Sequence, residues 1–124
     1  MNSNFNPLSA KELINRINKI PRVHLGQLPT VLELAPNISK ELNINLYIKR
    51  DDCTALAFGG NKTRHLEFIM AKKLKGDYDC ILTGAASQSN FCRQAVAAAN
   101  KLNLDSYLVL MHGIKGNLMQ GNFL

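Results

Sequence analysis

The feature that most limits the folds open to this chain is an alternation of short strand patterns with amphipathic helix patterns. Residues 46–49 alternate as a strand does, and residues 79–83 and 106–111 have the apolar composition of buried strands. Helices are expected over residues 61–75 and 90–102. Because strands joined through helices pair in parallel, we expect an α/β domain with one parallel sheet. Ligands of such domains bind beyond the carboxyl ends of the strands.

A capped helix and an extended segment are expected in the N-terminal part of the chain. Ser9 is a suitable N-cap for a helix over residues 9–20, and Glu12 stands three residues later, as in a capping box. A proline follows and ends this helix. Residues 22–36 are interpreted as extended chain, and a short helix is expected over residues 38–42.

The carboxyl end has the pattern of an unfinished element. Residues 117–124 resemble the opening turns of a helix, and no further segment follows against which their apolar side chains could pack. A sheet of about three strands is also small for an α/β fold. We therefore expect that the sequence is cut short within a larger fold.

Composition and charge argue against several classes of protein. The net charge is +6, but the basic residues are spread along the chain and only 6% of residues are aromatic, so no nucleic-acid partner is expected. No stretch approaches 18 consecutive apolar residues, so no membrane partner is expected. An odd number of cysteines and the lack of a secretion signal favour a cytoplasmic location. Histidine and cysteine spacing predicts no metal site.

Residues 58–64 (FGGNKTR) carry the strongest chemical signal. Two glycines allow a ligand to approach the backbone closely, and the helix that follows offers its N-terminus to an anion. Lys62 falls on the first turn of that helix, on the face that carries Leu66, Ile69 and Met70. The helix dipole and the loss of water both favour an uncharged amine there, as a Schiff-base lysine requires. The alternative is a lysine that extends past the apolar face into solvent.

Residues 84–90 (GAASQSN) form a second candidate segment, between a strand and a helix. Small and hydroxylated residues at such a junction offer backbone N–H groups and side-chain donors to an anion such as a carboxylate. The alternative is simple N-capping of the helix by Ser89 or Asn90, as Asn61 is expected to cap the preceding helix.

Two ordered motifs resemble the pyridoxal-phosphate enzymes of the D-cysteine desulfhydrase and 1-aminocyclopropane-1-carboxylate (ACC) deaminase family. The first is residues 49–68 (KRDDCTALAFGGNKTRHLEF), and the second is residues 88–94 (QSNFCRQ) with the alanine-rich helix behind it. Residues 25–30 (LGQLPT) and the pair Gly121 and Asn122 are similar to further family segments.

The resemblance implies the tryptophan-synthase-β-like fold, called fold type II, with a three-layer parallel sheet that is incomplete in this chain. Residues 1–50 would form the N-terminal lead of the large cofactor domain. Residues 51–124 would form part of the small α/β domain. The remainder of the catalytic core of the family would lie beyond the sequence.

The resemblance also implies roles for four residues. Lys62 would bind pyridoxal 5'-phosphate as a Schiff base and shuttle the α-proton of the substrate, and Asn90 would hydrogen-bond the phenolic oxygen of the cofactor. Ser89 would hold the substrate carboxylate and assist proton transfer. Phe91 stands at a substrate-binding position where family members often carry His or Gln.

The function implied by the resemblance is that of a pyridoxal-phosphate-dependent lyase. A small amino acid would be the substrate, and β-elimination of D-cysteine would give sulfide, pyruvate and ammonia. One alternative is a ring-opening deamination of the kind that ACC deaminase catalyses, and another is a non-catalytic remnant or interaction module. Full-length family members would form homodimers.

Overall fold

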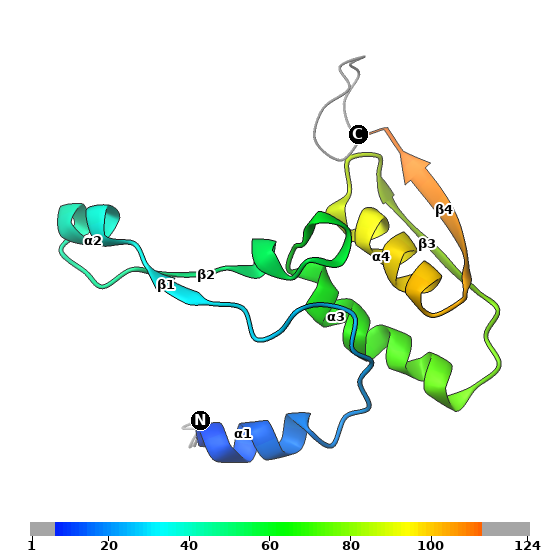
Figure 1. The fold of residues 1–124 in the computed structure, drawn as a ribbon, viewed down its shortest axis with the longest axis horizontal. Helices are drawn as coiled ribbons and strands as arrows, with labels where there is room; N and C mark the ends of the chain where they lie inside the picture. The colour runs from blue at the N-terminus through cyan, green and yellow to red at the C-terminus, as the bar shows by residue number, and fades with distance from the viewer. Residues whose placement is uncertain (1–6, 113–124) are drawn as a thin grey trace, which may run out of the picture.

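The structure is a computed structural model and describes residues 7–112. The expected helix over residues 117–124 and the pair Gly121 and Asn122 lie outside the described residues. The helices and strands follow one another as shown in Figure 1. The α-helices are Ala10–Ile17 (α1), Pro36–Leu42 (α2), Lys62–Ile69 (α3) and Asn90–Lys101 (α4). The strands are Leu32–Leu34 (β1), Tyr47–Lys49 (β2), Cys80–Ala86 (β3) and Asp105–Met111 (β4).

A parallel pair of strands carries the α/β part of the fold. β3 and β4 run in parallel, with Cys80 opposite Asp105 and Ala86 opposite Met111, and α4 connects them. β3 continues to Ala86, three residues beyond the expected end of the strand, because its last residues remain paired with β4. The strand–helix–strand unit predicted from the sequence is therefore present.

One prediction about the sheet is wrong. The strand over residues 46–49 does not join β3 and β4 but pairs in antiparallel fashion with β1, so that Leu32 lies opposite Lys49 and Leu34 opposite Tyr47. β1 lies inside the segment that was expected to be extended without a partner. The short link through α2 brings the two segments together locally, since Asn43 in the left-handed conformation ends α2 and turns the chain back.

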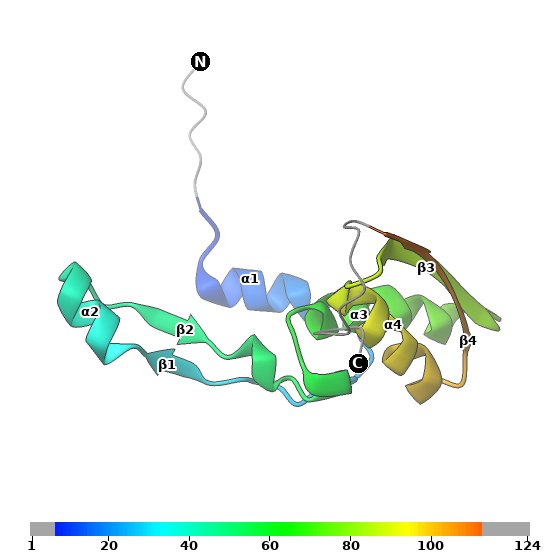
Figure 2. The ribbon, with the colours of Figure 1, turned by 90° about the horizontal axis from the view of Figure 1, so that it is seen from above.

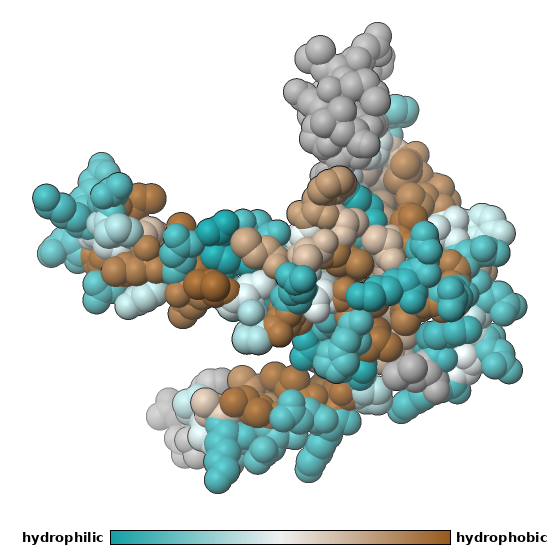
Figure 3. Space-filling view, in the orientation of Figure 1, coloured by the Kyte–Doolittle hydropathy of each residue, from teal (hydrophilic) through white to brown (hydrophobic). Residues whose placement is uncertain are grey.

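The β1–α2–β2 segment forms an arm that leaves the rest of the molecule. In two views at right angles the arm extends sideways from α3 and α4, with α2 at its tip (Figures 1 and 2). Apolar side chains remain uncovered along it, and α1 likewise exposes Leu13, Ile14 and Ile17 (Figure 3). No helix within residues 7–112 has the length and apolar character that crossing a membrane requires.

The N-terminal helix begins as its sequence predicts. Ser9 accepts a hydrogen bond from the backbone N–H of Glu12, and the Glu12 side chain accepts one from the backbone N–H of Ser9, which completes a capping box. α1 ends at Ile17, three residues earlier than expected. None of its residues is buried, so packing does not extend the helix further.

The hydrophobic core lies between α3, α4 and the segment that precedes the arm. The alanine-rich helix fits closely, because Ala95 and Ala98 are completely buried against Leu66 of α3. Val23 and Leu25 belong to the same core although they lie some forty residues earlier in the chain than α3. The expected helix over residues 61–75 is present, with α3 continued by a 3-10 helix over Met70–Lys75.

Two charged side chains of α3 tie the segments before and after the arm to this core. Buried Glu67 accepts hydrogen bonds from the backbone N–H groups of Leu25 (3.0 Å) and Gly26 (3.2 Å) and from Nε of Arg22 (2.6 Å). Burial alone would raise the pKa of Glu67, but these donors outweigh it and hold the pKa below the ordinary value. Further along, Arg64 donates to Asp51 in a two-pronged contact (3.0 and 2.8 Å) and lowers the pKa of that carboxyl.

Candidate active site at the start of helices α3 and α4

A turn with uncommon backbone angles leads into α3. The φ angle is positive at Ala55 (67°), Ala57 (45°), Phe58 (64°), Gly59 (75°) and Gly60 (133°). Three of these residues carry side chains, and such conformations persist only where surrounding contacts fix them. Backbone of this kind is concentrated at ligand sites, so the turn marks a candidate functional region.

The two glycines of the turn permit contacts that no other residue would allow. A Cβ atom on Gly59 would lie 1.9 Å from the backbone oxygen of Asp52, and one on Gly60 would lie 2.4 Å from Nε2 of Gln94. Nη2 of Arg93 also donates to the carbonyl oxygen of Gly59 at 3.3 Å. The turn before α3 therefore packs directly on the first two turns of α4.

Lys62 is the first residue of α3 and is half-buried. Within residues 7–112 its amine has neither a hydrogen-bond nor an ion-pair partner. The expected apolar face is formed in part, since Leu66 and Met70 are buried but Ile69 is 47% exposed. Asn61 does not cap the helix as expected, because its backbone is already helical and its side chain makes no capping bond.

Ser89 caps α4. Its Oγ accepts a hydrogen bond from the backbone N–H of Cys92 at 3.3 Å, and its own backbone N–H donates to the carbonyl oxygen of Ala86 at 2.9 Å. The capping role that was left open for Ser89 is thus confirmed. A capping hydroxyl accepts one bond and keeps its proton available to donate, so capping and anion binding are compatible at this residue.

Asn90 lies where the two sequence motifs meet. Its Nδ2 is 3.6 Å from the position that a Cβ on Gly60 would occupy, which places the Asn90 amide beside the turn that precedes Lys62. The turn and the start of α4 are neighbours in the ribbon view (Figure 1). Segments that are thirty residues apart in the sequence thereby form one surface.

The environment of Phe91 differs from that of Ser89 and Asn90. It is half-buried and packs against the hydrophobic core that contains Leu66 and Ala95. This contact explains an apolar side chain at that position. Its role in substrate binding remains a prediction.

Three buried polar residues behind the turn were not singled out from the sequence. Thr54, Thr63 and Gln94 are completely buried and are joined by hydrogen bonds, from Thr54 Oγ1 to Thr63 Oγ1 (3.0 Å) and from Thr63 Oγ1 to Gln94 Oε1 (2.8 Å). The available signal was a glutamine four residues after Asn90, on the same face of an otherwise alanine-rich helix.

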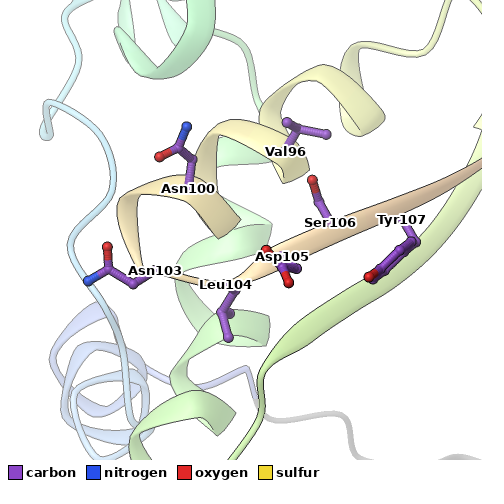
Figure 4. A pocket seen from close by; sticks show the side chains of 7 residues that line it. All are labelled: Val96, Asn100, Asn103, Leu104, Asp105, Ser106 and Tyr107. Carbon is purple, nitrogen blue, oxygen red and sulfur yellow. The ribbon is translucent and has the colours of Figure 1, made fainter.

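A hollow elsewhere on the surface does not include any of these residues. It has a volume of about 720 Å³ and lies between the last turn of α4 and the start of β4, where Asn100, Asn103 and Tyr107 contribute to its lining (Figure 4). It is therefore at the opposite end of α4 from Asn90. Among the described residues no three His, Cys, Asp or Glu side chains gather as metal ligands.

Comparisons with known proteins agree on one family. The family model described as pyridoxal-phosphate dependent enzyme matches residues 23–121. The D-cysteine desulfhydrase of Salmonella paratyphi C (strain RKS4594) is 44% identical over 101 residues, and that of Salmonella paratyphi B (strain ATCC BAA-1250 / SPB7) is 43% identical. Each match covers 82% of this chain and 31% of the relative. This chain thus spans about a third of the length of these curated relatives.

A solved structure extends the comparison to the fold. The crystal structure of an ACC deaminase homologue is similar over 94% of this chain and 34% of that chain, with a TM-score of 0.79 and 38% sequence identity. The chain belongs to the family of pyridoxal-phosphate dependent enzymes. The fold class expected from the sequence, an incomplete α/β fold of type II, is confirmed by the same likeness.

The residues at the start of α3 and α4 fit the cofactor of this family. Pyridoxal phosphate carries an aldehyde, a phenolic oxygen and a phosphate, which require an amine, a hydrogen-bond donor and a positive field. Lys62 has an amine without a partner among the described residues, and Asn90 has an amide donor beside the turn that precedes Lys62. The N-termini of two helices supply the positive field, and the absence of a side chain on Gly60 allows them to approach one another.

Proposed function

We propose that this chain carries the lysine-bearing part of a pyridoxal-phosphate-dependent lyase that acts on a small amino acid by β-elimination, as in D-cysteine desulfhydrase. The observation that supports it best is the contact of the Gly60 turn with Asn90 and Gln94, which brings the turn that leads to Lys62 against the start of α4. The names of the relatives support D-cysteine as the substrate.

The proposed roles divide between the two helices. Lys62 binds the cofactor aldehyde through Nζ and afterwards moves the α-proton of the substrate at the same atom. Nδ2 of Asn90 donates a hydrogen bond to the phenolic oxygen. The hydroxyl of Ser89 and the free N–H groups of the first turn of α4 bind the substrate carboxylate. When bound, the cofactor supplies an electron sink that makes the Cα–H bond acidic.

The overall reaction proposed consumes one water. The Cα–H and Cβ–S bonds of D-cysteine break, sulfide leaves with the electron pair of the C–S bond, and water then releases the nitrogen as ammonia and leaves pyruvate. In this scheme Lys62 accepts the α-proton.

The domain division expected from the sequence is also a proposal. Residues 1–50 would belong to the large domain of the complete enzyme and residues 51–124 to the small domain. The exposed apolar side chains of α1 and of the β1–α2–β2 arm support the first part, because such surfaces pack against other elements in a complete fold. The packing of Val23 and Leu25 on α3 links the two parts.

Two other functions are kept as candidates. Ring-opening deamination of ACC is supported by the likeness to the ACC deaminase homologue. A non-catalytic module is supported by Phe91, because this apolar side chain packs against the core at a position where family members often carry His or Gln. Sulfide release from D-cysteine would separate the first function from ACC deamination, which yields ammonia without sulfide.

Covalent labelling tests the proposed role of Lys62. The 124-residue chain is incubated with pyridoxal phosphate, reduced with borohydride, digested, and the modified lysines are identified by mass. We expect one adduct at Lys62 that is lost in Lys62→Ala and retained in Lys40→Ala, since Lys40 is an exposed residue of α2. Equal labelling of Lys62 and Lys40 in the wild-type chain would contradict the proposal.

A further inference from the structure

We propose that a buried hydrogen-bond chain from Thr54 through Thr63 to Gln94 positions Lys62 relative to Asn90, and that Gln94 is the anchor of this chain on α4. The inference rests on the proposed function, because it assigns positioning residues to the lysine that would bind the cofactor. None of the three residues is proposed to touch the cofactor or the substrate.

The chain of hydrogen bonds holds the backbone on both sides of Lys62. On the N-terminal side, Oγ1 of Thr54 accepts from the backbone N–H of Gly60 at 2.9 Å and lies 2.9 Å from its carbonyl oxygen. On the C-terminal side, Thr63 follows Lys62 directly, and its Oγ1 lies 3.0 Å from Oγ1 of Thr54. Only Asn61 and Lys62 stand between the two fixed residues, so the start of α3 has little freedom to shift.

The hydrogen-bond chain ends at Gln94, on the helix that carries Asn90. Thr63 Oγ1 donates to Gln94 Oε1 at 2.8 Å, and Gln94 is four residues after Asn90, one helical turn along the same face of α4. The side chains of Thr63 and Gln94 therefore fix the backbone of Lys62 relative to that of Asn90. The Thr63–Gln94 bond is a directional contact between the two helices themselves, whereas the apolar packing between them is non-directional.

The N-terminal segment also contacts the two threonines of this hydrogen-bond chain. The backbone N–H of Gln27 donates to the carbonyl oxygen of Thr54 at 3.0 Å. A Cβ on Gly26 would lie 2.5 Å from Cγ2 of Thr63 and 2.7 Å from the Thr54 carbonyl oxygen, so this glycine is in direct contact with both threonines. Three segments that are distant in the sequence thus converge on the same pair of threonines.

The polarity of this cluster has a cost that a purely structural role does not require. Nε2 of Gln94 is buried without a hydrogen-bond partner, which is unfavourable for an amide nitrogen. An apolar side chain of similar volume at position 94 would fill the same space without that penalty. What it would lack is the directional bond to Thr63, and this difference points to positioning as the role of Gln94.

Two substitutions at Thr63 separate positioning from stability. Thr63→Val keeps the methyl group that contacts Gly26 and removes the hydroxyl, whereas Thr63→Ser keeps the hydroxyl and removes the methyl group. A structural role predicts that the two variants lose function in proportion to their lost stability. Positioning predicts that Thr63→Ser behaves as wild type in the site even where it is the less stable variant. Gln94→Met is a third variant, which removes the acceptor from the other end of the bond.

The first measurement does not involve the cofactor. In the wild-type chain and in Thr63→Ser, we expect nuclear Overhauser effects from the α-protons of Gly60 to the side-chain amide protons of Gln94 and Asn90, since these groups are in contact. In Thr63→Val and Gln94→Met we expect the intensity of the nuclear Overhauser effect between Gly60 and Asn90 to fall by about tenfold or to vanish. Unchanged contacts in both of these variants would overturn the inference.

The second measurement is the selectivity of pyridoxal phosphate for Lys62 over Lys40, determined by borohydride reduction at a temperature where urea titrations show every variant to be folded. We expect the ratio to fall by about tenfold in Thr63→Val and Gln94→Met and to stay within about twofold of wild type in Thr63→Ser. Equal ratios in all four chains would overturn the inference while leaving the proposed function intact. If the wild-type chain shows no selectivity, the proposed function fails, and the contacts measured without cofactor still decide the inference.

Discussion

Oγ1 of Thr63 and Oε1 of Gln94 are joined by a 2.8 Å hydrogen bond between two completely buried side chains of different helices. Thr63 follows Lys62 on α3, and Gln94 lies one turn beyond Asn90 on α4. The bond connects the two motifs through which the sequence resembles its family. The following predictions concern the stability of the fold, and the first concerns a direct neighbour of Gln94.

Replacing Gly60 by alanine is expected to destabilise the fold by about 2–3 kcal/mol. The added Cβ would lie 2.4 Å from Nε2 of Gln94, and the φ angle of 133° is unfavourable for any residue with a side chain. The free energy of unfolding from urea titrations measures the loss. Gly76→Ala is the matched control, because Gly76 has an extended backbone and the atoms nearest to a Cβ there belong to the exposed ring of Tyr78. Equal losses in the two variants would contradict the prediction.

Glu67→Gln is expected to lower the free energy of unfolding by about 2–3 kcal/mol at pH 7, because the buried carboxylate accepts three hydrogen bonds, one of them from Arg22. Glu41→Gln, at an exposed position of α2, should be nearly neutral. A loss no larger than that of the control would show that the Glu67 charge is not needed.

The contribution of Glu67 should also depend on pH in a defined direction. Its pKa is lower in the folded chain than the ordinary value of 4.5, so its stabilisation is complete above that value and is lost as the pH falls through the lower folded pKa. Unfolding free energies of wild type and Glu67→Gln should therefore converge as the pH is lowered from 7 towards about 3. A constant difference over this range would be inconsistent with the pKa shift.

A double-mutant cycle on Arg64 and Asp51 should give a coupling of about 0.5–1 kcal/mol. Their contact is two-pronged and partly shielded, and it holds the pKa of Asp51 below its ordinary value. The more exposed pair Arg50 and Asp52 serves as the comparison and should show a smaller coupling. Larger coupling in the exposed pair would reverse the proposed order.

Ser9→Ala should weaken α1 alone. The capping box contributes about 1 kcal/mol to the helix, but α1 has no buried residue and so adds little to global stability. Amide exchange in α1 should accelerate by about fivefold while exchange in α4 is unchanged. Lys11→Ala, in the same helix but outside the box, is the control and should leave both rates as they are. Acceleration in α4 would mean that α1 supports the core.

Local signals predicted several elements of the fold correctly. The capping box at Ser9 starts α1, and the alanine-rich pattern gives α4 with its buried face at Ala95 and Ala98. These predictions succeed because capping and side-chain periodicity act within a few residues. The strand over residues 46–49 was recognised, but its partner was not, since pairing of β1 with β2 depends on where α2 turns the chain.

The candidate site was predicted in part. Lys62, Ser89 and Asn90 were singled out from short motifs, and the structure brings the turn before Lys62 into contact with Asn90. Phe91 was also singled out and packs against the core. Thr54, Thr63 and Gln94 were not recognised, because their residue types are ordinary and only their burial together makes them informative.

The sequence by itself determined most of the helices and strands, which lysine follows the glycine pair, and to which family the motifs belong. It could do so because hydrophobic periodicity, helix caps and glycine-rich turns are properties of neighbouring residues. Only the tertiary structure decided that β2 pairs with β1 and that Gly60 contacts Gln94. It also placed Gly26 against the methyl group of Thr63 and the backbone carbonyl of Thr54. The pairing of β2 with β1 depends on where α2 turns the chain back. The contacts of Gly60 and Gly26 join residues far apart in the chain, and they form only when the segments pack around a common core.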